Sequence, residues 1–108
     1  MRRLIRTILE RRGHQVSEAR DGLEGLAGVD ARRPDLVVTD LVMPGIGGLA
    51  LFAELQRRTS PPKVLIVSGK RFRPDEEWPA LAAKGLVGFR EKPFTPAELA
   101  QSVHALVG

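Results

Sequence analysis

The sequence predicts a single α/β domain, built on a doubly wound, mostly parallel sheet with helices on both faces. Helical and strand-like segments alternate along the 108 residues in the order α-β-α-β-α-β-α-β-α, with short connections. Two of the strand-like segments, Leu36–Thr39 and Val64–Val67, are short apolar runs typical of strands covered on both faces. A chain of this length supports one hydrophobic core.

The expected helices follow from apolar periodicity and from capping residues. They are placed at residues 2–12, 21–29, 49–58, 79–84 and 95–107. Asp21 stands three residues before Glu24, and Thr95 stands three residues before Glu98, so both pairs predict capping boxes. Gly13 is a natural residue to end the first helix.

The expected strands are placed at residues 15–19, 36–39, 64–67 and 86–90, the first being weak. Asp40, Ser68 and Lys92 each lie at or just past the end of one of them. Because ligands bind at the carboxyl ends of the strands in such folds, we expect these three side chains to converge.

A carboxylate, a hydroxyl and an ammonium group suit a phosphoryl group. The carboxylate of Asp40 can act as a nucleophile, and Ser68 and Lys92 can then bind the phosphoryl oxygens. Taken singly, each residue has a plain structural explanation, as a turn residue or a solvated lysine. Their shared position at one edge of the sheet favours a phosphoryl-binding site over these separate structural roles.

Composition excludes several other classes of function. The sequence has no cysteine, which excludes disulfides and Cys-based metal sites. The net charge of +4 comes with basic pairs near helix ends and without interleaved aromatic residues, so a nucleic-acid surface is not favoured. No apolar run has the length of a membrane span or resembles a signal peptide. We therefore expect a cytoplasmic protein without membrane association.

Three segments resemble the receiver domain of two-component response regulators. Residues 34–45 resemble the phosphorylation-site strand and loop, residues 64–69 the fourth strand with its switch hydroxyl, and residues 89–94 the fifth strand with its Lys-Pro signature. The resemblance covers essentially the whole chain. It implies a flavodoxin-like sheet in the order 2-1-3-4-5, and a signalling domain rather than an enzyme.

The resemblance also implies roles for particular residues. Asp40 would accept a phosphoryl group from a histidine kinase or a phosphotransfer protein, Ser68 and Lys92 would bind its oxygens, and Phe89 would turn inward as the switch. For Phe89, a plain core aromatic is an equal alternative. Asp40 and the backbone carbonyl of Val42 would be Mg²⁺ ligands.

The resemblance further implies a cis Lys92–Pro93 bond and an output surface. That surface would be built from the fourth helix, the last strand and the last helix, with Trp78, Arg90 and Glu91 as contact candidates for a partner or a homodimer. Nucleic acid would be bound only through an output domain outside this chain.

The sequence departs from the family at its start, because residues 1–6 already match the first helix. The first strand and its acidic pair, about a dozen residues, are absent, and Glu10 and Glu18 do not replace the pair. We therefore expect residues 1–108 to be an N-terminally truncated receiver domain. The alternatives are a complete protein that fills the gap by strand exchange in a dimer, and a second strand that shifts to pair with the third.

The missing acids lead to a functional expectation. A single carboxylate makes a weak Mg²⁺ site, so phosphorylation of Asp40 should be slow or absent. The alternative function is a phosphorylation-independent protein-interaction module with the same fold.

Overall fold

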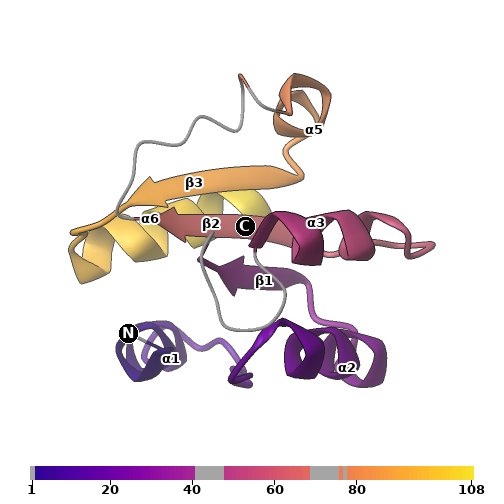
Figure 1. Cartoon of the computed structure of the whole chain (residues 1–108). Helices are drawn as coiled ribbons and strands as arrows, with labels where there is room; N and C mark the ends of the chain where they lie inside the picture. Colours follow the sequence, from indigo (N-terminus) through magenta and orange to yellow (C-terminus); the bar gives the residue numbers. More distant parts are fainter. Residues whose placement is uncertain (1, 41–47, 69–75, 77) are drawn as a thin grey trace.

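The computed structural model describes residues 2–40, 48–68, 76 and 78–108. The helices and strands run α1 (Arg2–Glu10), α2 (Gly22–Arg32), β1 (Leu36–Thr39), α3 (Gly48–Gln56), β2 (Lys63–Ser68), α5 (Pro79–Ala83), β3 (Val87–Glu91) and α6 (Pro96–Val107). Figure 1 shows α3 in front of the strands and α6 behind them. The predicted α/β fold with a parallel sheet covered on both faces is confirmed.

Within the described ranges the sheet has three strands in the order β1-β2-β3, all parallel. Two of the predicted strands are confirmed almost to the residue, and the third runs from Val87 to Glu91, one residue later than predicted. The buried strand β2 is the central one, and its side chains alternate between the clusters on the two faces of the sheet.

The strand predicted at residues 15–19 is not formed. A strand needs a neighbour with which to form ladder hydrogen bonds. In the described structure β1 forms its ladder with β2 and not with residues 15–19. The shift of this segment onto β1 is therefore not observed. Side chains hold the segment instead, because Val16 packs against the core and the Glu18 carboxylate pairs with Arg6 at 3.1 Å.

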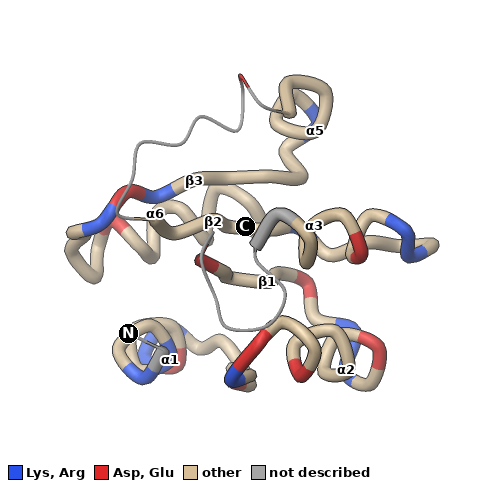
Figure 2. The backbone as a smooth tube through the Cα atoms, in the orientation of Figure 1, with Lys and Arg blue, Asp and Glu red and all other residues tan. Residues whose placement is uncertain are grey.

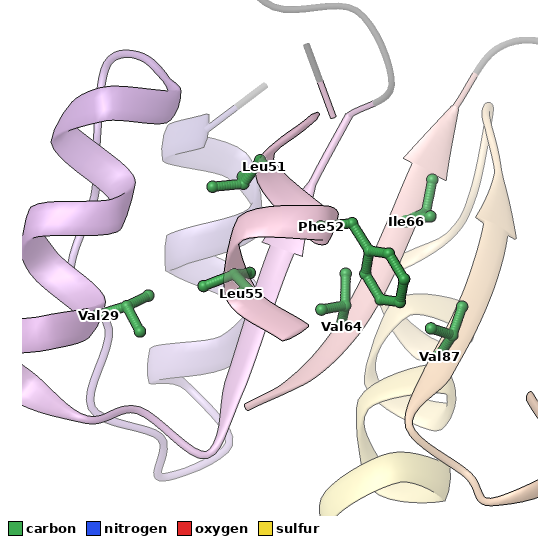
Figure 3. Close-up of a cluster of buried hydrophobic side chains, with 7 residues drawn as sticks. All are labelled: Val29, Leu51, Phe52, Leu55, Val64, Ile66 and Val87. Atoms are coloured by element: carbon green, nitrogen blue, oxygen red, sulfur yellow. The ribbon is translucent and has the colours of Figure 1, made fainter. Parts of the chain in front are cut away.

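The core has two layers, one on each face of the sheet. The front cluster joins α2 and α3 to the sheet (Figure 3) and consists of Val29, Leu51, Phe52, Leu55, Val64, Ile66 and Val87. The rear cluster joins α1 and α6 to it and consists of Ile8, Leu9, Leu65, Val67, Leu99, Val103 and Leu106. No helix in the described parts of the chain is long and apolar enough to cross a membrane.

Both predicted helix caps are formed. At α6 the capping box is complete: the Glu98 N–H donates to Thr95 Oγ1 at 3.1 Å, and the Thr95 N–H donates to the Glu98 carboxylate at 2.8 Å. At α2 the Glu24 N–H donates to Asp21 at 2.9 Å, but the Glu24 carboxylate accepts from the Arg20 N–H and not from the N-cap. The second box is thus only half of the predicted motif.

The cap at α6 makes stability depend on pH. The hydrogen bond from the Thr95 N–H, the contact with the Thr95 side chain and the charge of Arg90 together lower the pKa of Glu98. A carboxyl group whose pKa is lower in the folded state stabilises the fold at pH values above its ordinary pKa, about 4.3 for glutamate. This stabilisation is lost as the pH falls through the folded-state pKa. Replacing Glu98 with glutamine should therefore flatten the fall in Tm between about pH 5 and pH 3.

The control for this prediction is Glu76→Gln, because Glu76 is exposed. Thermal melts of both variants across this pH range check the expectation. An equal pH dependence of Tm in Glu98→Gln and the wild type would contradict it.

Gly88 marks the closest approach of the sheet to α6. A Cβ at this position would lie 2.9 Å from Leu106 Cδ1 and 3.4 Å from Leu65 Cδ1. Gly88→Ala should therefore lower the free energy of unfolding by about 1–3 kcal/mol through overpacking. Gly25→Ala is the matched control, because among the described residues its Cβ would meet Ala19 Cβ at an ordinary contact distance of 3.9 Å. That change removes a helical glycine and should stabilise by up to about 1 kcal/mol, so urea unfolding should give opposite signs.

Candidate functional site

Asp40, Ser68 and Lys92 lie together at the edge of the sheet where its strands end. Asp40 follows β1, Ser68 is the last residue of β2, and Lys92 follows β3. All three strands are parallel, so these ends share one edge, and Figure 2 shows charged segments there at the ends of β1 and β3. The predicted convergence of the three residues is found in the structure.

The Asp40 carboxylate and the Lys92 ammonium are in direct contact. Lys92 Nζ donates to Asp40 Oδ2 at 2.5 Å, and the side chains are 26% and 31% exposed. At this depth the two charges are screened less than a pair on the surface, and each lowers the cost of desolvating the other. The charges of the two side chains cancel, while Asp40 still faces solvent in part.

Backbone pairing fixes the third residue next to this pair. Ser68 is opposite Glu91 in the last register of the β2–β3 ladder, and the Lys92 N–H donates to the Ser68 carbonyl at 2.8 Å. The ladder thus continues one residue beyond β3. Ser68 is 3% exposed, and the predicted cis Lys92–Pro93 bond is confirmed.

Thr39 is a residue of this edge that sequence reasoning missed. It is buried, it ends β1, and its hydroxyl donates to the Asp40 carbonyl at 3.1 Å. The sequence does place its hydroxyl next to the candidate acid. That signal is weak, because threonine is common in strands. This hydrogen bond is made to the backbone of Asp40, which carries the candidate carboxylate.

The other predicted residues stand as follows. Phe89 is partly buried in β3, packs against the front cluster, and is opposite Ile66 in the ladder. Val42 lies outside the described residues. Among the residues that are described, no group of three acidic, histidine or cysteine side chains could hold a metal ion.

Two of the three expected surface contacts are engaged within the domain itself. Arg90 Nε donates to Ser102 Oγ at 2.8 Å, and its guanidinium lies 3.6 Å from the Glu98 carboxylate. The Trp78 ring stacks on Phe52. Glu91 is exposed at the end of β3. Neither tertiary contact is visible in the sequence, because each joins residues from separate elements.

Comparison with known proteins decides the family. The family model of the response regulator receiver domain matches residues 1–104. The chain is a response-regulator receiver domain. This assignment agrees with the fold, with the edge residues and with the resemblance of the three sequence segments. The β1-β2-β3 order corresponds to the 3-4-5 part of the expected receiver sheet.

Relatives of this receiver domain include short and long proteins. Protein PilH of Pseudomonas aeruginosa is 31% identical over 105 residues, which cover 95% of this chain and 85% of PilH. The transcriptional regulatory protein ResD of Bacillus subtilis is 31% identical over 109 residues, which cover 99% of this chain but 43% of ResD. The receiver domain thus spans less than half of the ResD protein.

Solved structures agree. NtrX of Brucella abortus is 30% identical, with a TM-score of 0.80, over 98% of this chain and 24% of NtrX. The receiver domain of a Bermanella marisrubri response regulator is 29% identical, with a TM-score of 0.76, over 97% of this chain and 87% of that one. These neighbours support the receiver fold.

Proposed function

We propose that this receiver domain accepts a phosphoryl group on Asp40, from a histidine kinase or a phosphotransfer protein. The observation that carries the proposal is the contact of Asp40 with Lys92 beside Ser68, at one edge of a parallel sheet. In the transfer, a carboxylate oxygen of Asp40 would bond to phosphorus as the bond from phosphorus to the donor nitrogen breaks. The donor imidazole would keep the electron pair and take up a proton.

The neighbouring residues would bind the product. The Lys92 ammonium would move from the carboxylate to a phosphoryl oxygen. It would there neutralise part of the negative charge that the phosphoryl group adds. The Ser68 hydroxyl would donate to another oxygen, and Phe89 would respond as the switch residue between the edge and the surface of β3. The sensor kinase CckA of Brucella abortus is 35% identical over 101 residues, which cover 10% of that protein, and this similarity supports a role of the domain in kinase signalling.

The described residues do not fit a strong Mg²⁺ site. The Asp40 carboxylate is held by an ammonium group, and no metal-binding group of three side chains lies in the described ranges. Because a cation would have to displace Lys92 and would gain one carboxylate, we propose that Mg²⁺ binds weakly. Phosphorylation should then be slow compared with a receiver domain that carries two further acids.

The same observation supports a second candidate, a receiver-like interaction module that works without phosphorylation. A carboxylate already neutralised by Lys92 needs neither metal nor phosphoryl group for a stable fold. In both cases we propose a partner or homodimer surface over α5, β3 and α6. Strand exchange beside β1 is another route to a dimer, because a strand edge presents unpaired backbone groups.

Beryllofluoride, a mimic of the phosphoryl group, separates the two candidates. We expect bound fluoride signals in ¹⁹F NMR and shifts in the amides of Ser68 and Lys92 for a phosphorylation-competent site. Asp40→Asn should abolish both effects. Asp35→Asn is the matched control, because this exposed aspartate precedes β1 at its opposite end. Absence of binding to the wild type at saturating beryllofluoride and Mg²⁺ would reject the acceptor role and favour the module.

A further inference from the structure

Two aromatic rings from separate elements stack in the front layer of the domain. Phe52 belongs to α3 and is buried, whereas Trp78 is the N-cap of α5 and is partly buried. Their ring centroids lie 4.3 Å apart with an interplanar angle of 18°. The stack therefore joins α3, which follows Asp40 in the sequence, to α5, which lies later in the chain than Ser68.

Helix α5 buries little of itself against the other described residues. It has five residues and none of them is buried. A helix this short is not stable through its own hydrogen bonds, so it depends on packing. Partly buried Trp78 and Leu81 pack against the front cluster, and the Leu86 N–H donates to the Leu81 carbonyl at 3.0 Å.

We infer that α5 docks on the domain as a separate cooperative unit, and that the stack of Trp78 on Phe52 sets how often it opens. Residues with few buried contacts open locally at a free energy below that of global unfolding. Because Phe52 is carried by α3, a movement of α3 changes the docking of α5 directly. This docking of α5 through the ring stack takes place in the unphosphorylated domain and does not depend on the acceptor role of Asp40.

Hydrogen exchange of the intact domain tests the inference. In the wild type, the hydrogen-bonded amides of Ala82 and Lys84 should exchange through local opening, faster than the amides of β2. Phe52→Leu keeps an apolar side chain but removes the ring. It should speed exchange of the α5 amides by about 2- to 10-fold over the wild type, since a ring pair contributes roughly 0.5–1.5 kcal/mol and 1.4 kcal/mol is tenfold. The emission of Trp78, the sole tryptophan of the sequence, should shift to the red.

Phe94→Leu is the matched control, because Phe94 is partly buried against the rear cluster. It should leave the exchange rate of the α5 amides at its wild-type value. Trp78→Leu gives a second route if Phe52→Leu does not fold, and it should produce the same acceleration in α5. Exchange of α5 in step with β2 in the wild type, or an α5 exchange rate in the ring variants equal to that of the wild type, would overturn the inference.

Discussion

Lys92→Met should lower the rate at which acetyl phosphate labels Asp40 by roughly 100-fold, the loss typical for removal of one donor to developing charge. Methionine keeps an unbranched apolar side chain but leaves both the Asp40 carboxylate and the incoming phosphoryl oxygens without their contacting ammonium group. The rate is measured by intact mass spectrometry over time.

Two further variants show whether this loss comes from the charge at the site. Lys84→Met removes an ammonium group from the exposed C-cap of α5 and should not change the rate. Lys92→Arg should recover only part of it, because the guanidinium is larger and planar. Labelling of Lys92→Met at the wild-type rate would show that Lys92 has no part in the transfer.

Leu55→Ala should lower the free energy of unfolding by about 2–5 kcal/mol. Leu55 is fully buried in α3, in the front cluster between α2 and the sheet (Figure 3). Truncation removes apolar contacts and leaves a cavity that a sheet and two helices cannot close without moving. For a domain of ordinary stability, about 5–15 kcal/mol, this is a large fraction of the total.

Leu23→Ala is the control for that loss, because Leu23 is 65% exposed in α2. Its effect should stay within about 0.5 kcal/mol. Urea unfolding followed by circular dichroism gives both values. A change below about 1 kcal/mol for Leu55→Ala would contradict the assignment of Leu55 to a close-packed core.

The sequence was sufficient to predict the site edge, and the physical reason is topological. Asp40, Ser68 and Lys92 are far apart along the chain, but each lies at or just past the end of a strand, and parallel strands end at the same edge. Thr95 and Glu98 were equally predictable, because a capping box is a local interaction. Strand Leu36–Thr39 could be placed because its apolar run is short and bounded by Pro34 and Asp40.

Features that depend on a distant partner were not predictable. Residues 15–19 have a strand-like pattern, but no partner strand in the described sheet pairs with them. The stack of Trp78 on Phe52 and the contact of Arg90 with Ser102 join elements whose relative position is set only by the folded core. The structure places Trp78 and Arg90 in contacts within the domain, and their role at an output surface stays a prediction.

The central claim is that Asp40 is the phosphoryl acceptor of this receiver domain. Its most direct test is intact mass spectrometry of the wild type and Asp40→Asn after prolonged incubation with acetyl phosphate and Mg²⁺. We predict a slow gain of one phosphoryl group in the wild type, removed by hydroxylamine as expected for an acyl phosphate, and no gain in Asp40→Asn. An unchanged wild-type mass, or an equal gain in Asp40→Asn, would contradict the claim.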